Sequence, residues 1–192
     1  ALTGGTGELP GTGPDLAGLL RSVPDHPSPG ITFWDITPLL ADATALRAAT
    51  DGIADLARSL GPVDLVAGVE ARGFVVGTPL ALALGAGFVP LRKAGKLPWR
   101  TVRQAYSLEY GEAVIEAHED AVPAGARVLV VDDVLATGGT AAAACALVQR
   151  LGGTVAGAGF LMELPALGGR TALRAAAGAD VAVVSLLQVP PG

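Results

Sequence analysis

The sequence predicts an α/β fold, in which a central, mostly parallel sheet is flanked by helices on both faces. Two observations lead to this prediction. Short runs rich in Val, Leu and Ile alternate along the chain with longer alanine- and leucine-rich segments of helical periodicity. Of the 192 residues 51% are hydrophobic but only 4% are aromatic, and small aliphatic side chains suit helices packed closely on a parallel sheet. In such a sheet, ligands bind beyond the carboxyl ends of the strands.

The first forty residues are expected to contain little regular structure. Residues 1–14 are rich in Gly, Thr and Pro, and we expect a disordered leader there. Residues 15–23 have the composition of a short helix that ends at Pro24. Residues 24–38 contain four prolines, which excludes a regular element.

The remaining elements alternate between helix and strand. The first long helix has Leu46, Ala49, Ile53, Leu56 and Leu60 on one face and ends at Gly61-Pro62. The other expected helices are residues 74–84, 140–151 and a short one at 170–176. The expected strands are residues 63–69, 88–91, 128–131, 155–162 and 181–187, with a hairpin at 107–118 that turns near Gly111.

The segment 127–140, RVLVVDDVLATGGT, indicates binding of a phosphorylated sugar. A strand ends in two acids, Asp132 and Asp133, and a glycine turn at 136–140 leads into a helix. Backbone N–H groups and the helix dipole hold a phosphate at such a turn. The carboxylates can accept hydrogen bonds from vicinal hydroxyls or hold a hydrated cation, and two adjacent acids are unfavourable without such partners.

Charge is distributed unevenly along the chain. The net charge of −5 argues against general nucleic-acid binding. No acid lies between Glu70 and Glu109, yet six of the thirteen cationic residues do: Arg72, Arg92, Lys93, Lys96, Arg100 and Arg103. This pattern favours a site for a compact anion, and the alternative is a solvated basic face.

Missing patterns argue against nucleoside triphosphate hydrolysis, a dinucleotide-binding fold and a zinc site. The sequence has neither G-x-x-x-x-G-K-[ST] nor a G-x-G-x-x-G after a strand, and its two histidines lack a zinc spacing. The single Cys145 permits no intrachain disulfide, and we expect it to be a small core residue. No secretory signal and no apolar run of about 18 residues is present, so a soluble cytoplasmic protein without membrane contact is expected.

Five segments together resemble the type I phosphoribosyltransferases, and in more detail those members that act on adenine. Residues 130–140 resemble the family's motif for phosphoribosyl pyrophosphate (PRPP). The other segments are PGITF at 29–33, EARGF at 70–74, RKAGKLP at 92–98 and YSLEYG at 106–111. The resemblance extends from about residue 16 to 187. In the family an arginine often stands where this chain has Trp34, which bears on base preference.

The resemblance implies a purine-salvage enzyme that transfers the 5-phosphoribosyl group from PRPP to adenine, giving AMP and pyrophosphate. It also implies Mg²⁺ as the cofactor and a homodimer. The alternatives are a phosphoribosyltransferase for guanine, xanthine or orotate, or a non-catalytic PRPP-binding regulator. The implied organisation is one domain over 15–192, the type I phosphoribosyltransferase fold, with a small N-terminal hood at about 15–40 and a flexible catalytic loop at about 93–110.

The resemblance also implies roles for particular residues. Glu109 is the expected general acid and base, with Arg72 as a second catalytic residue. PRPP is expected to contact Asp132, Asp133, Ala136, Thr137, Gly138, Gly139 and Thr140. Pyrophosphate is expected to contact Ala71, Arg72, Lys93 and Lys96, and adenine to contact Thr32, Phe33, Trp34 and Leu135. Mg²⁺ is expected to have no dedicated protein ligand set and to be held by PRPP and water near Asp132 and Asp133. A cis peptide bond is expected at Glu70–Ala71.

Overall fold

A computed structural model describes residues 14–108 and 111–190 of the chain. The chain divides into two compact units, the first ending at Ala48 and the second beginning at Ala49. The first unit is small, and the second contains the larger sheet and most of the helices.

The first unit contains a small two-stranded sheet followed by helical structure. Strand β1 (Arg21–Val23) pairs in antiparallel fashion with β2 (Phe33–Asp35). Helix α1 (Thr37–Ala41) follows, and α2 (Ala43–Arg58) begins in this unit and ends in the next.

Two predictions for this unit were wrong. No helix forms at 15–23, because Arg21–Val23 pair with β2, and the few residues before them, which include Gly18, form only a turn. In that turn the Asp15 carboxylate accepts a hydrogen bond from the Gly18 N–H (3.0 Å). Residues 24–38 are not wholly irregular either. No proline falls within β2, and Pro38 lies in the first turn of α1, where its missing N–H has no helical partner to lose.

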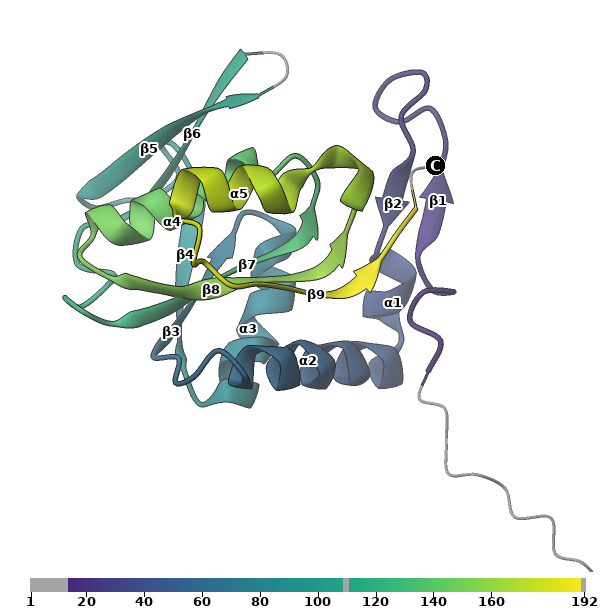
Figure 1. The fold of residues 1–192 in the computed structure, drawn as a ribbon, viewed down its shortest axis with the longest axis horizontal. Helices are drawn as coiled ribbons and strands as arrows, with labels where there is room; N and C mark the ends of the chain where they lie inside the picture. The colour runs from purple at the N-terminus through teal and green to yellow at the C-terminus, as the bar shows by residue number, and fades with distance from the viewer. Residues whose placement is uncertain (1–13, 109–110, 191–192) are drawn as a thin grey trace, which may run out of the picture. The chain divides into compact units, whose positions relative to one another are not determined.

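A seven-stranded mixed sheet forms the centre of the second unit (Figure 1). Its strand order is β5-β6-β4-β3-β7-β8-β9. Five neighbouring strands run parallel: β4 (Gly87–Lys93), β3 (Leu65–Val69), β7 (Arg127–Leu135), β8 (Thr154–Glu163) and β9 (Val183–Gln188). The hairpin of β5 (Thr101–Leu108) and β6 (Gly111–His118) adds to β4 in antiparallel fashion. The predicted, mostly parallel sheet is therefore confirmed.

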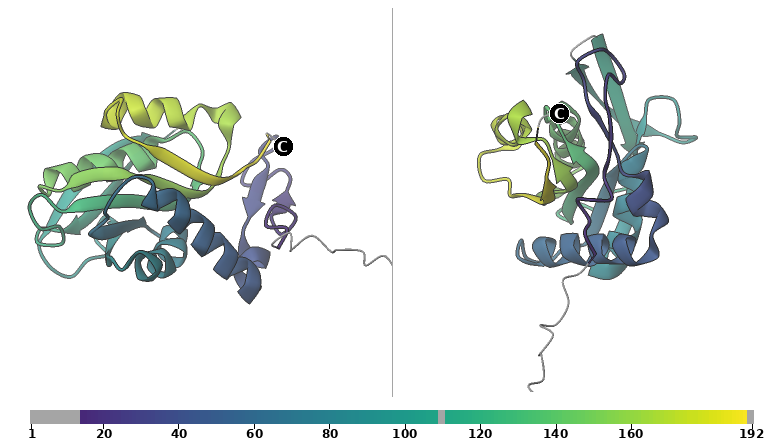
Figure 2. Two further views of the ribbon diagram at one scale, coloured as in Figure 1. Left: turned by 60° about the horizontal axis from the view of Figure 1, so that its bottom comes forward. Right: turned by 90° about the vertical axis from the view of Figure 1, so that its right-hand side faces the viewer.

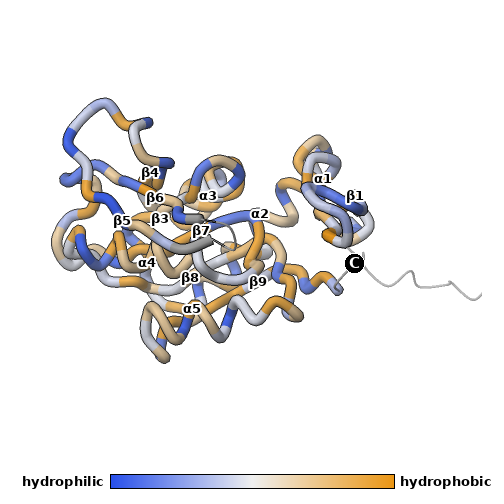
Figure 3. The backbone as a smooth tube through the Cα atoms, turned by 90° about the horizontal axis from the view of Figure 1, so that it is seen from above, coloured by the Kyte–Doolittle hydropathy of each residue, from blue (hydrophilic) through white to orange (hydrophobic). Residues whose placement is uncertain are grey.

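Helices cover both faces of this sheet, as predicted. Helix α3 (Arg72–Leu84) and the later part of α2 lie on one face, and α4 (Gly139–Arg150) and α5 (Gly169–Ala177) on the other (Figures 1 and 2). A short 3₁₀ helix, η1 (Pro165–Leu167), precedes α5. Hydrophobic and hydrophilic residues alternate along α5 (Figure 3), which buries Leu173. No helix in the described ranges is both long and apolar enough to cross a membrane.

Small side chains let α4 pack closely on the sheet, since it buries Ala141, Ala143, Ala144, Cys145, Leu147 and Val148. The position of Cys145 is the one expected of a core residue. Burial raises the pKa of its thiol to about 12, so the thiol stays protonated and unreactive at neutral pH.

Two predicted strand boundaries were too short. β7 runs on to Leu135 in place of ending at Val131, because its pairing with β8 continues past the acids: Asp132 lies opposite Phe160. The hairpin at 107–118 is confirmed, but its first strand already begins at Thr101. That strand occupies much of the span expected as a flexible loop.

Candidate active site

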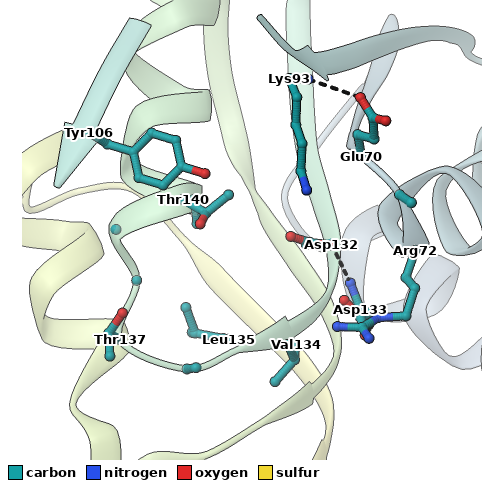
Figure 4. A pocket seen from close by; sticks show the side chains of 15 residues that line it. Glu70, Arg72, Lys93, Tyr106, Asp132, Asp133, Val134, Leu135, Thr137 and Thr140 are labelled. Carbon is teal, nitrogen blue, oxygen red and sulfur yellow. Dashed lines mark hydrogen bonds and ion pairs between the residues drawn. The ribbon is translucent and has the colours of Figure 1, made fainter. Parts of the chain in front are cut away.

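A pocket of about 400 Å³ lies at the carboxyl edge of the parallel strands in the second unit (Figure 4). Because β3, β4 and β7 are parallel, the segments that follow them meet at this edge. The lining residues are Glu70, Ala71, Arg72, Lys93, Tyr106 and the continuous run 132–141. The sequence-predicted motifs at 70–74 and 130–140 are therefore brought together.

The turn between β7 and α4 is built to receive an anion. Gly138 has φ +86°, a left-handed conformation that favours glycine, and α4 begins immediately after it. The Ala142 N–H bonds to the Gly138 carbonyl (2.9 Å). The N–H groups of the residues just before Ala142 therefore have no acceptor within the helix, and they point toward the end of α4 that lines the pocket. Thr137 and Thr140 add hydroxyl groups to the same lining. Such a helix N-terminus favours a phosphate.

The two acids on β7 have different surroundings. Asp133 is almost fully buried, and its Oδ2 lies 2.5 Å from Nε of Arg72. The two side chains form an ion pair. Oδ1 of Asp132 accepts the N–H of Asp133 (2.9 Å). Desolvation, with repulsion from Asp133, raises the pKa of Asp132 well above its usual 3.8. A hydroxyl or cationic ligand would therefore stabilise the charged form of Asp132.

The turn after β3 fixes a second set of polar groups. The Glu70–Ala71 peptide bond is cis, as the resemblance implied. Oε2 of Glu70 accepts the backbone N–H of Lys93 (2.9 Å) and Nε of Arg92 (3.3 Å). These bonds, that of Lys93 first, lower the pKa of Glu70. The Lys93 side chain points into the pocket (Figure 4).

Carboxylates from outside the acid-free segment pair with four of its six cations. Arg72 pairs with Asp133, Arg92 with Glu70, Arg100 with Glu119 and Arg103 with Glu116. Of the six, Arg72 and Lys93 line the pocket, whereas Lys96 does not. Among these six cations, Arg72 and Lys93 are therefore the two whose position in this structure suits contact with an anion in the pocket.

Glu116 is a buried acid that the sequence analysis did not single out. Its side chain on β6 is 0% exposed. It accepts the N–H groups of Lys96 (3.0 Å) and Leu97 (3.1 Å), the Thr101 hydroxyl (3.2 Å) and Nε of Arg103 (3.0 Å). Burial alone would raise the pKa of Glu116, but the bonds from Leu97 and Arg103 outweigh it and the pKa is lowered. Glu116 therefore holds the β4–β5 connection as an ionised acceptor. The sequence pattern that could have identified Glu116 is a charged residue between two apolar ones, Ile115 and Ala117.

Tyr106 is a further lining residue without a predicted role, although it belongs to the YSLEYG segment. It enters the pocket from the side opposite Arg72 (Figure 4). Leu135, predicted to contact adenine, is buried and also lines the pocket. Glu109 lies outside the described residues.

The predicted base contacts Thr32, Phe33 and Trp34 belong to the first unit. Phe33 and Trp34 lie on β2, half-buried, and directly follow Thr32. The Phe33 ring contacts the His26 ring edge-to-face at 5.3 Å between centroids.

No group of three or more His, Cys, Asp or Glu side chains suited to a metal ion occurs in the described part of the chain. The pocket does offer the Asp132 and Asp133 carboxylates. Mg²⁺ keeps several waters and is commonly held by one or two carboxylates together with substrate phosphates. The lining therefore fits a cation that arrives with a phosphorylated substrate.

Residues 39–171 match the family described as "Phosphoribosyl transferase domain". This match covers more than half of the chain, and the chain belongs to that family. Its fold is the type I phosphoribosyltransferase fold, with a mixed central sheet flanked by helices.

Curated relatives within the family are adenine phosphoribosyltransferases. That of Thermobifida fusca is 57% identical over 171 residues, which cover 88% of this chain and 93% of the relative. That of Streptomyces clavuligerus is 50% identical over 185 residues, covering 96% and 100%.

Solved structures of similar proteins carry the same name. The adenine phosphoribosyltransferase of Rhodothermus marinus has a TM-score of 0.84 and 48% identity, covering 91% of this chain and 96% of its own. The Saccharomyces cerevisiae enzyme also has a TM-score of 0.84, at 40% identity and 90% and 97% coverage. It was solved in complex with an imino-altritol bisphosphate and adenine.

Proposed function

We propose that this protein is an adenine phosphoribosyltransferase of purine salvage, which converts adenine and PRPP into AMP and pyrophosphate. One observation carries the proposal. A single pocket joins a helix-terminal phosphate turn, an acid pair and two cationic side chains, Arg72 and Lys93. These are the groups that a sugar with a phosphate at each end requires, and the relatives that share this fold at 48–57% identity are adenine phosphoribosyltransferases.

The 5-phosphate of PRPP binds at residues 136–140 in this proposal. The N–H groups at the start of α4 and the hydroxyls of Thr137 and Thr140 donate to its oxygens. The carboxylates of Asp132 and Asp133 accept hydrogen bonds from the ribose 2- and 3-hydroxyls. The raised pKa of Asp132 supports this role, because hydroxyl donors would offset the charge repulsion from Asp133.

The pyrophosphate group binds at the other side of the pocket. Arg72 and Lys93 supply positive charge, and Ala71 supplies backbone contacts. Lys96 is proposed to join them as a further contact, although it does not line the pocket in this structure. The ion pair of Arg72 with Asp133 holds the guanidinium at the pocket rim.

In the reaction, the bond between the anomeric carbon and the pyrophosphate oxygen breaks as adenine N9 bonds to that carbon. Both electrons of the broken bond leave with pyrophosphate. The ring proton of adenine passes to a base, which we propose to be Glu109. Positive charge grows on the ribose ring in the transition state, and Asp132 and Asp133 lie where carboxylates would oppose it.

Adenine is proposed to stack on Phe33, with backbone groups of Thr32 and Trp34 reading its edge. Leu135 closes the opposite face. The contact of Leu135 is supported by its place in the pocket lining, and those of Thr32 and Phe33 by the resemblance of residues 29–33 to the corresponding family segment.

Mg²⁺ is the proposed cofactor, held by PRPP and water near Asp132 and Asp133. When bound it would neutralise part of the pyrophosphate charge. We further propose a cytoplasmic homodimer in which residues 15–192 act as one domain, with a hood at about 15–40 and a catalytic loop at about 93–110.

The proposal is tested by measuring PRPP-dependent pyrophosphate release with adenine, hypoxanthine, guanine, xanthine and orotate. Adenine should give the highest kcat/KM. Higher turnover with another base would assign the enzyme to that base, and Trp34, where many family members carry arginine, would be the first position to examine. No release with any base would favour a non-catalytic PRPP-binding protein.

A further inference from the structure

The phosphate turn rests directly on the first residue of α5. A Cβ atom at Gly138 would lie 2.5 Å from the carbonyl oxygen of Gly169. A Cβ atom at Gly169 would overlap the carbonyl oxygen of Ala136. The two backbones therefore pack with no side chain between them, and the position of the turn depends on where α5 begins.

Arg170, the next residue, fixes the start of α5 to the sheet. Its Nε donates to Oε1 of Glu163 (3.0 Å) and its Nη2 to Oε2 of the same carboxylate (2.5 Å). Its Nη1 donates to the carbonyl of Val183 (2.5 Å). The Ser185 hydroxyl donates to Oε2 of Glu163 (2.9 Å). Since Glu163 ends β8 and Val183 begins β9, one guanidinium ties α5 to two strands.

This network is specific in geometry as well as in charge. Glu163 is only 4% exposed, and the hydrogen bonds from Arg170 lower its pKa. A two-pronged guanidinium–carboxylate contact fixes orientation, which a single point charge does not. Replacing Arg170 leaves the buried Glu163 carboxylate without its match.

We propose that Glu163, Arg170 and Ser185 form a clamp that positions the β7–α4 turn for the 5-phosphate of PRPP. This inference rests on the proposed function. None of the three residues lines the pocket, so they act through Gly169 as positioning residues. Loosening the clamp shifts the N–H groups that hold the 5-phosphate. The pyrophosphate end keeps its own supports, because Arg72 is held by Asp133 and the Lys93 backbone by Glu70.

The test compares two ligands, one for each end of the pocket. Dissociation constants for ribose 5-phosphate and for magnesium pyrophosphate are measured by calorimetry on the wild type, Glu163→Gln and Arg170→Lys. Both substitutions nearly conserve size. We expect them to raise Kd for ribose 5-phosphate about tenfold, the loss typical of removing a group that orients a binding residue. Kd for pyrophosphate should not change, and KM should rise for PRPP but not for adenine.

Arg174→Lys is the matched control, because Arg174 lies on the same helix and donates to the Val181 carbonyl (3.4 Å), and the substitution keeps the positive charge that acts on Glu163 from a distance. It should leave both dissociation constants unchanged. Ser185→Ala removes the hydroxyl that donates to Glu163 (2.9 Å) and accepts a longer bond from Nη2 of Arg170 (3.4 Å), but it leaves the Arg170–Glu163 contact itself. It provides a milder variant if Glu163→Gln does not fold, and it should weaken ribose 5-phosphate binding selectively.

Equal weakening of both ligands, or unchanged ribose 5-phosphate binding in the folded variants, would overturn the clamp. The two proposals fail in different ways. A wild type that binds ribose 5-phosphate with this clamp dependence but forms no AMP would refute the function and leave the clamp standing. AMP formation together with ribose 5-phosphate binding that does not depend on the clamp residues would refute the clamp and leave the function standing.

Discussion

Arg72 and Asp133 join the two strand-end segments of the pocket, with Nε of the first 2.5 Å from Oδ2 of the second. The arginine begins α3, just after β3, and the aspartate lies near the end of β7, the parallel neighbour of β3. Asp133 is nearly fully buried, whereas Arg72 is 44% exposed. The guanidinium is therefore anchored at its base and still accessible to an anionic ligand.

Lys93 and Lys96 should differ in their effect on the donor. Lys93 lines the pocket and Lys96 does not. We expect Lys93→Ala to raise KM for PRPP about tenfold or more, since a hydrogen bond to a charged group contributes roughly 1.5–3 kcal/mol. Lys96→Ala is the control from the same segment and should have a smaller effect. If the two variants raise KM for PRPP equally, Lys96 contacts the donor as closely as Lys93 does, and the greater role given to Lys93 is wrong.

Replacing Glu116 should destabilise the protein. Glu116→Gln removes a fully buried charge that accepts four hydrogen bonds from the β4–β5 connection and β5. We expect the free energy of unfolding in urea to fall by about 2–4 kcal/mol. Glu119→Gln is the matched control, because its contact with Arg100 is exposed and 3.5 Å long, and it should cost under about 0.5 kcal/mol. Similar losses in both variants would contradict this account of Glu116.

The stability difference between the wild type and Glu116→Gln should depend on pH. The folded protein holds the pKa of Glu116 below its usual 4.5. Between the two values the unfolded chain binds more protons, so this contribution is present above the unfolded pKa and is lost as pH falls through the folded pKa. The free energy of unfolding in urea should be measured for both proteins from about pH 7 to about pH 3, a range that includes the usual pKa of glutamate. The difference between the two proteins should shrink below about pH 5. A stability difference that stays constant down to the most acidic pH would refute the claim that the ionised Glu116 carboxylate stabilises the fold.

Glu109 is expected to act in the chemical step. Glu109→Gln preserves size but cannot accept the adenine ring proton, so kcat should fall by about 10²-fold or more, as is typical for the loss of a general base. PRPP affinity, measured by calorimetry, should change little. An unchanged kcat would remove Glu109 from catalysis.

The parts of the site that could be predicted from sequence are those formed by consecutive residues. The acid pair and the turn at 136–140 occur in one strand-turn-helix unit, and a parallel sheet brings such a unit to the same edge as the Glu70 turn. The Ala-rich composition of α4 likewise predicted its close packing.

Features that depend on strand register or on side chains far apart in sequence were not predictable. The pairing of Arg103 with Glu116 requires that β5 and β6 align these two positions. The same is true of the Arg170 contact with Glu163, which depends on where α5 returns to β8. The helix expected at 15–23 is missing for a similar reason, because residues 21–23 pair with β2.

The most direct test of the central claim is the formation of AMP from labelled adenine and PRPP, followed together with pyrophosphate release. The wild type should produce the two in equal amounts. Asp132→Asn combined with Asp133→Asn should lose this activity by about 10²-fold or more, because the carboxylates that face the developing positive charge are gone. Pyrophosphate release without AMP, or undiminished AMP formation by the double variant, would contradict the account.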